Sequence, residues 1–333
     1  MLCLGTNTHY FRSMSFTSSP VQSDDLYAAT VARVDTAFRD AGLYGRLHVL
    51  DIDNGTEISL GGDAVRHSAS TGKVPILVAL MRAVAMGALS LDEQIDVPAG
   101  DRTDGPTGLS SMRYPARLAL GDIAHLMMSI SDNHATDLVL RRVPPGQVTA
   151  AMRDLGLTVT TLEMTITEMF ARYAAGDFDG RHEAGFWRTT AVEMCRLLQA
   201  IWLDAAAPAA LCEQMRGMLR SCLTSNGLDC QLPQAVQATS GRKTGTLVGI
   251  EADDGDGTGF ILRNEVGVVE FQDGHRYAVA VFTQAQGTGL RARDPATNRA
   301  LGAAVRVAID GLRDGAARRS VPPKTVTPTA DGI

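Results

Sequence analysis

Lysine is scarce in this chain. The 31 basic residues include only three lysines, at Lys73, Lys243 and Lys324. Arginine stays protonated in proteins, whereas a desolvated lysine can lose its proton. In a chain that uses arginine for most of its positive charges, a lysine is therefore a candidate for a chemical role. Lys73 ends the run STGK and Lys243 begins the run KTGT, so each lies beside hydroxyl side chains. These two lysines are therefore candidates for a functional site.

Aromatic residues and positive charge are also in short supply. Phe, Trp and Tyr make up 5% of the chain, and the net charge is -6 with a pI near 5.6. A nucleic-acid partner is not expected, because neither stacking platforms nor a basic patch are indicated. The five cysteines are scattered and odd in number, without metal-ligand spacing. We expect reduced thiols, no disulfide framework, no metal and no cofactor.

The sequence also lacks a long hydrophobic run. The longest apolar stretch, residues 74–89, is interrupted by Pro75 and Arg82 and is too short to span a bilayer. The N-terminus has no basic start followed by an apolar core, so it does not resemble a secretory signal. We expect a cytoplasmic protein without a membrane span, and an exported form only if the native N-terminus differs.

A length of 333 residues with 45% hydrophobic content allows a large core. Strand patterns lie near both ends and a helical block lies between them. We expect an α/β (α+β) fold, in which an antiparallel sheet is flanked by helices and an all-helical subdomain forms a cleft with it. The expected limits are a flexible leader at 1–24, an α/β subdomain at 25–69 and 223–314, a helical subdomain at 70–222 and a disordered tail at 315–333.

Ser70 and Lys73 form a Ser-x-x-Lys pattern at the start of a predicted helix over 71–86. This spacing places the hydroxyl and the amine on one face, where a neutral amine can take the serine proton. By itself, this pattern is explained more simply by Ser70 as a helix cap. Two further motifs follow in order, SDN at residues 131–133 and KTG at residues 243–245. Together the three motifs resemble the class A β-lactamase and penicillin-binding-protein family of serine hydrolases, over residues 26–314.

The resemblance implies a role for each motif residue. Ser70 is the nucleophile, Lys73 its base, and Ser131 relays a proton to the leaving nitrogen. The backbone N–H groups of Ser70 and Thr246 form the oxyanion hole. The implied substrate-binding residues are Asn133, Lys243, Thr244, Gly245 and Thr246. Asp132 is expected to be structural and to bond the local backbone.

One departure from the family pattern concerns the glutamate that holds the deacylating water in class A lactamases. Alignment through Leu162 puts Ile166 at this position. Glu163 and Glu168 are the possible substitutes, although Glu168 also fits a capping box that begins at Thr165. We therefore expect that the protein can be acylated but is not rapidly deacylated.

Three functions remain open from the sequence. The first is a β-lactamase-like hydrolase that forms an acyl-enzyme on Ser70 and hydrolyses a β-lactam or a related cyclic amide. The second is an esterase, D-amino-acid peptidase or transacylase of the same fold in a biosynthetic pathway. The third is a penicillin-binding protein that is acylated but barely turns over. In each case the partner is a small amide or ester that carries a carboxylate, and the oligomeric state stays open.

Overall fold

The computed structural model describes residues 24–176, 186–233, 237–248, 259–286 and 294–320. Its centre is a five-stranded antiparallel sheet in the order β2-β1-β10-β9-β8. The strands are β1 (Tyr44–Asp51), β2 (Glu57–Leu60), β8 (Gln237–Val248), β9 (Phe260–Phe271) and β10 (Arg276–Gln286). Because β1 pairs with β10, both ends of the chain build one sheet. This confirms the predicted sheet.

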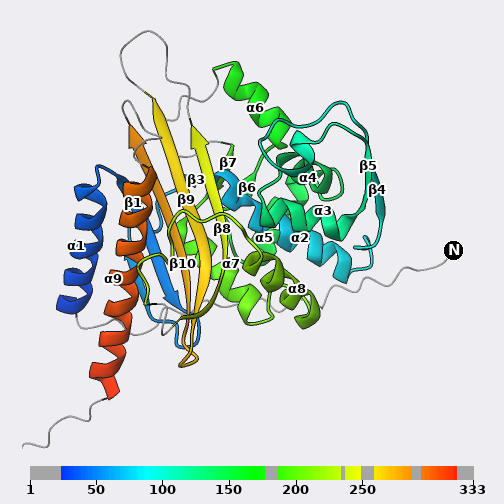
Figure 1. Ribbon diagram of the computed structural model, residues 1–333. Coiled ribbons are helices and arrows are strands. Elements are labelled where there is room, and N and C mark those ends of the chain that lie inside the picture. The colour runs from blue at the N-terminus through cyan, green and yellow to red at the C-terminus, as the bar shows by residue number, and fades with distance from the viewer. Residues whose placement is uncertain (1–23, 177–185, 234–236, 249–258, 287–293, 321–333) are drawn as a thin grey trace, which may run out of the picture.

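Helices cover both faces of the sheet. Helices α1 (Asp24–Asp40) and α9 (Asp294–Ser320) lie on one face, and the helical block lies on the other (Figure 1). The strands alternate accordingly, since Val279 and Val281 of β10 face α1 and α9 while Ala280 and Phe282 face the block. Helix α9 extends beyond the predicted end, so residues 315–320 are helical instead of part of a disordered tail. The run GAARRS contains helix-forming Ala and Arg and precedes the first proline of the tail.

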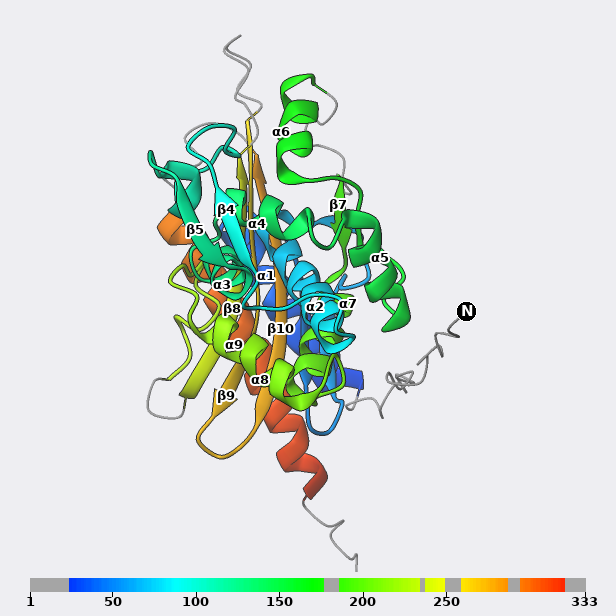
Figure 2. The ribbon, with the colours of Figure 1, turned by 90° about the vertical axis from the view of Figure 1, so that its right-hand side faces the viewer.

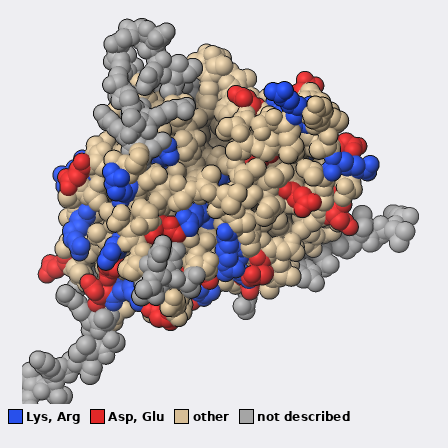
Figure 3. All heavy atoms as spheres, in the orientation of Figure 1, with Lys and Arg blue, Asp and Glu red and all other residues tan. Residues whose placement is uncertain are grey.

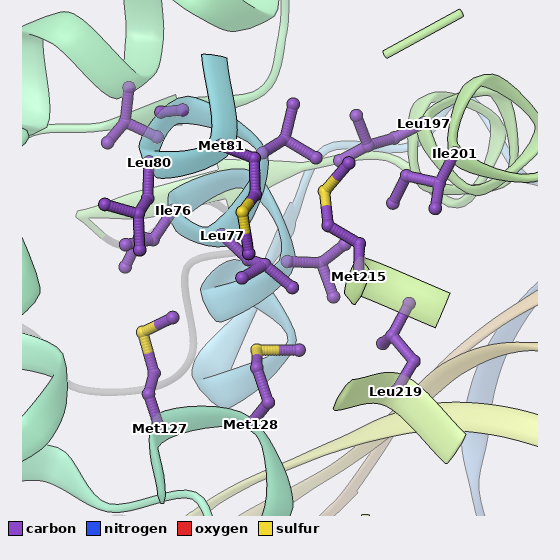
Figure 4. Close-up of a cluster of buried hydrophobic side chains, with 14 of the residues drawn as sticks. Ile76, Leu77, Leu80, Met81, Met127, Met128, Leu197, Ile201, Met215 and Leu219 are labelled. Atoms are coloured by element: carbon purple, nitrogen blue, oxygen red, sulfur yellow. The ribbon is translucent and has the colours of Figure 1, made fainter. Parts of the chain in front are cut away.

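The helical block is arranged around one buried helix (Figure 2). Its helices are α2 (Lys73–Ala85), α3 (Leu120–Ser129), α4 (Asn133–Leu140), α5 (Pro145–Asp154), α6 (Ile166–Ala174), α7 (Ala191–Trp202) and α8 (Ala209–Arg220). Apart from Lys73 and Arg82, helix α2 is apolar on all sides, as is typical of a helix that others surround. Leu77 and Met81 of α2 pack with Met127, Met128 and Met215 in a fully buried cluster (Figure 4).

The block also contains two small sheets that the sequence patterns did not predict. One pairs β4 (Gln94–Val97) with β5 (Ala116–Ala119), and the other has the order β3-β7-β6. The latter strands are β3 (Arg66–His67), β6 (Thr161–Leu162) and β7 (Trp187–Thr189). Strands of two to four residues are too short for an alternating pattern to be recognised. The subdomain at residues 70–222, which we expected to be all-helical, therefore contains short strands beside its helices.

The second small sheet positions the site, because it joins the segment before Ser70 to the segment before α6. Strand β3 continues into a 3-10 helix, η1 (Ala69–Gly72), which leads directly into α2. No helix in the described ranges is long and apolar enough to cross a membrane.

Candidate active site

Ser70 lies in the 3-10 turn that precedes α2. The N-cap positions of η1 and α2 are Ser68 and Gly72, so Ser70 caps neither helix. Ala69 has a φ of 47°, a left-handed value that is uncommon for a residue other than glycine. Ser70 is partly exposed between buried neighbours. In a 3-10 turn the side chains at i and i+3 lie one above the other, so Ser70 and Lys73 share a side.

The Lys73 amine joins the first motif to the second. Its Nζ lies 2.7 Å from the Ser131 carbonyl oxygen, 3.1 Å from Ser131 Oγ and 2.9 Å from Asn133 Oδ1. A neutral amine has two N–H donors and one lone pair. In the neutral form, the Ser131 carbonyl and the Asn133 amide oxygen can take both donors, and the lone pair is then left for the proton of the Ser131 hydroxyl. This arrangement fits a lysine that acts as a base.

The electrostatic environment favours the neutral form of Lys73. The side chain is fully buried, and this burial holds its pKa well below the usual value. The positive charge of Lys243 acts in the same direction, and the carboxylates of Asp132 and Asp137 oppose it. Because desolvation disfavours the charged form, burial favours the neutral amine, which is the form that can accept a proton.

Asp132 holds the second motif in place, as expected. Its carboxylate accepts hydrogen bonds from the backbone N–H of Leu109 at 2.5 Å and of Ala135 at 3.0 Å. The second of these bonds caps α4. The preceding residue, Ser131, has a φ of 59°, so its side chain and carbonyl both turn toward Lys73.

The third motif lies on β8, an edge strand of the main sheet. Gly245 passes so close to the nucleophile turn that a Cβ atom there would be 3.0 Å from the Ser70 nitrogen and 2.9 Å from the Ser68 oxygen. Only glycine allows this approach. Thr246 follows on the same strand and is exposed. Its implied oxyanion-hole N–H stays a prediction, which is supported by the edge position of β8, since an edge strand can direct backbone N–H groups away from the sheet.

Lys243 is fully buried and donates from Nζ to the Thr244 carbonyl oxygen at 2.9 Å. Burial lowers its pKa from 10.5 to about 8, while Cys222 and Glu265 act in the opposite direction. Thr244 Oγ1 shares a hydrogen bond of 2.7 Å with Thr224 Oγ1. The motif thus offers an amine and a hydroxyl pair at the sheet edge, which suits a substrate carboxylate.

Asp137, which the sequence analysis missed, fixes the position of Ile166. Its carboxylate accepts from the Ile166 N–H at 2.8 Å and from the Thr167 N–H at 3.0 Å. Asn133 and Asp137 are one helical turn apart on α4. Because Asp137 binds the Ile166 N–H, the start of α6 lies near the Asn133 end of α4. The Ile166 side chain is buried among apolar neighbours.

The two glutamates near Ile166 are both engaged elsewhere. Glu168 accepts from the Thr165 N–H and hydroxyl, each at 2.8 Å, in the capping box that its spacing predicted. These hydrogen bonds lower its pKa. Glu163 pairs with Arg188 of β7. The structure thus gives each carboxylate a local partner at the start of α6.

Asn264 of β9 is a second residue that the sequence analysis missed. It is buried, and its Nδ2 donates to the carbonyl oxygens of His67 at 2.9 Å and Ser68 at 3.2 Å. This side chain fastens the nucleophile segment to the sheet. An asparagine inside an apolar strand pattern is the one signal that could have indicated a structural polar contact.

The surface agrees with a cleft between the sheet and the helical block. The space-filling view shows a hollow there, with few charged side chains at its centre (Figure 3). Among the described residues, no group of three or more His, Cys, Asp or Glu side chains could hold a metal ion.

Comparison with known proteins agrees with this geometry. The sequence model of the β-lactamase enzyme family matches residues 29–311. The chain is 31% identical over 284 residues to the β-lactamase regulatory protein BlaB of Streptomyces cacaoi, across 75% of this chain and 87% of that protein. A β-lactamase from Sphaerobacter thermophilus superposes with a TM-score of 0.69 at 25% identity, covering 90% of this chain and 98% of the other.

A fourth comparison is with PBP-A, whose mutant is known as an acyl-enzyme complex with penicillin G. It superposes with a TM-score of 0.67 at 22% identity, covering 86% of this chain and 98% of the other, and so supports the fold. The match of the family model spans most of the chain, and it includes all three motifs. The chain therefore belongs to the β-lactamase enzyme family.

Proposed function

We propose that this protein is acylated on Ser70 by a β-lactam and hydrolyses the acyl-enzyme slowly, so that it acts as a penicillin-binding protein more than as an efficient β-lactamase. The observation that carries this proposal is the contact between Asp137 and the Ile166 N–H at 2.8 Å. This bond holds the backbone of Ile166, an apolar residue that the family resemblance aligns with the deacylating glutamate.

The acylation step needs a base and an oxyanion site. Neutral Lys73 takes the proton of Ser70 Oγ, and the oxygen attacks the lactam carbonyl carbon. The backbone N–H groups of Ser70 and Thr246 bind the developing oxyanion. The C–N bond then breaks, and the proton passes through Ser131 to the leaving nitrogen. The 3.1 Å contact between Lys73 Nζ and Ser131 Oγ supports this relay.

The third motif orients the substrate. Lys243 and Thr244 bind the carboxylate of the β-lactam, while the close approach of Gly245 brings the strand edge beside Ser70. The Asn133 side chain accepts from Lys73 and donates to the Asp104 carbonyl oxygen at 2.9 Å. Its amide carries a second N–H, which can meet an acyl side-chain carbonyl.

Hydrolysis needs a group that positions and activates a water molecule. The Ile166 side chain offers no polar atom, Glu168 is held by its capping box and Glu163 is paired with Arg188. A long-lived adduct also suits the name of the Streptomyces cacaoi relative, a β-lactamase regulatory protein. A protein that keeps its acyl group can report the presence of a β-lactam.

The test is intact-protein mass spectrometry over time with penicillin G and with a cephalosporin. We expect a stoichiometric adduct that forms much faster than it is lost, and no adduct in Ser70→Ala. Rapid accumulation of hydrolysed product would instead support an efficient β-lactamase. An adduct that persists in Ser70→Ala would contradict the nucleophile assignment, and the absence of any adduct would favour the esterase or transacylase alternative.

A further inference from the structure

His67 lies between the nucleophile turn and helix α6. It is the last residue of β3 and is 3% exposed. Its Nδ1 accepts a hydrogen bond of 2.9 Å from the backbone N–H of Ala69. Its Nε2 is hydrogen-bonded to the hydroxyl of Tyr173, on α6. One imidazole ring therefore contacts both the turn that carries Ser70 and the helix that begins at Ile166.

The two contacts determine the tautomer of the ring. A nitrogen that accepts from a backbone N–H carries no proton, so the proton of the neutral ring lies on Nε2. Nε2–H then donates to the Tyr173 oxygen. Burial lowers the pKa of His67 to about 4, so the ring is neutral at neutral pH. The Nδ1 acceptor is therefore available under ordinary conditions.

The residue held by this acceptor has an unfavourable backbone conformation. A left-handed φ at a residue other than glycine is unfavourable and persists only where the surroundings determine it. Ala69 has this conformation with a φ of 47°. The Nδ1 contact satisfies the N–H of Ala69, and the next N–H along the chain belongs to Ser70. The ring thus acts at the residue that sets the direction of the nucleophile's own amide.

The opposite side of His67 is also fixed. Tyr173 stacks on Phe186, with ring centroids 5.8 Å apart. Asn264 binds the His67 and Ser68 carbonyl oxygens from β9. Because its backbone and both ring nitrogens are held, the imidazole cannot move without breaking one of these contacts.

We propose that His67 is a positioning residue for the acylation of Ser70, whose Nδ1 holds the strained Ala69–Ser70 turn while Nε2–H ties the turn to α6 through Tyr173. This inference rests on the proposed acylation of Ser70. His67 does not touch the reacting atoms and acts through the backbone that presents them.

Two amide substitutions separate the two ring nitrogens. In His67→Asn, the amide oxygen lies near the former Nδ1 and can still accept from the Ala69 N–H. In His67→Gln, the amide group lies near the former Nε2, so the Ala69 N–H loses its acceptor. We expect the second-order rate of acylation by penicillin G to fall by about tenfold or more in His67→Gln. In His67→Asn it should stay within about threefold of wild type.

The exposed His125 of α3 gives a matched control, since neither amide substitution there should alter the rate. Tyr173→Phe removes the partner of Nε2–H but leaves Nδ1 on the Ala69 N–H, so its acylation rate should fall by no more than about threefold, as in His67→Asn. Equal rates in the two His67 variants, or the reverse order, would overturn the proposal, provided that both melt cooperatively near the wild-type temperature.

A second readout does not depend on acylation. Nitrogen-15 NMR of the histidines should show the Nε2–H tautomer for His67, and hydrogen exchange at the Ala69 amide should speed up in His67→Gln but not in His67→Asn. If the wild type is not acylated, the proposed function fails while these measurements still test the role of His67. An Nδ1–H tautomer, or equal exchange in both variants, would show that His67 does not hold the turn.

Discussion

The carboxylate of Asp137 accepts a hydrogen bond of 2.8 Å from the backbone N–H of Ile166. It also binds the N–H of Thr167 at 3.0 Å and the hydroxyl of Thr103 at 2.8 Å. A single buried side chain therefore fastens the start of α6 and the loop at Thr103 to the helix of the second motif. This relationship places an apolar residue beside the site.

Asp137→Ala should destabilise the protein, because several buried N–H and hydroxyl groups lose their acceptor at once. We expect a decrease of about 3 kcal/mol in the free energy of unfolding, measured by urea denaturation. The control is Asp96→Ala, whose carboxylate is 81% exposed in its contact with Arg117. That variant should stay within about 0.5 kcal/mol of wild type. Equal losses in the two variants would show that Asp137 does not fasten α6.

Gly245→Ala should slow acylation with little change in secondary structure. The new methyl group would lie 3.0 Å from the Ser70 nitrogen, against backbone that cannot move away cheaply. The strand edge must then move away from the nucleophile. Gly146→Ala is the matched control, because nothing lies within 4 Å of the added carbon. The measurement is the rate of adduct formation with penicillin G, and unchanged acylation in Gly245→Ala would contradict the close approach.

Lys73→Arg puts a permanent positive charge in place of the amine that we propose as the base. Because guanidinium does not lose its proton, the acylation rate should fall by about 10²- to 10⁴-fold. Lys324→Arg, in the C-terminal tail, serves as the control. The rate of adduct formation is measured by stopped flow or quenched flow. A near-normal rate in Lys73→Arg would show that Lys73 is not the base.

The pH dependence of acylation follows from the two buried lysines. Lys243 binds a carboxylate only when protonated, and its pKa is lowered to about 8, so acylation should fall as the pH rises through about 8. Lys73 must be neutral, so acylation should also fall as the pH drops through its lowered pKa. A penicillin ester without the free carboxylate should lose the alkaline decline and keep the acid one. The same alkaline decline with the ester would exclude Lys243 as its source.

The sequence predicted the parts of the molecule that depend on local pattern. The main sheet, the helices and the three motifs follow from periodicity and from residue order, and the capping box at Thr165 was readable from its spacing. The alignment through Leu162 put Ile166 at the position of the family's glutamate, and this stays a prediction. The structure adds that Ile166 begins α6, where Asp137 binds its N–H.

The remaining features depend on contacts between distant segments. Nothing local shows that Asn264 of β9 would hold the His67 carbonyl, or that His67 would meet Tyr173. The extent of burial of Lys243, which lowers its pKa, likewise results from packing of the whole domain. The two-residue strands β3 and β6 form because β7 lies between them, and no pattern within them predicts this.

The most direct test of slow deacylation is the lifetime of the penicilloyl adduct in wild type, Ile166→Glu and Ile166→Gln. Each adduct is formed, freed of excess penicillin G and followed by intact mass over time. We predict a long-lived adduct in wild type and in Ile166→Gln, and clearance faster by about 10²-fold or more in Ile166→Glu, where a carboxylate can activate water. Rapid clearance in wild type, or equal lifetimes in folded Ile166→Glu and Ile166→Gln, would contradict the account.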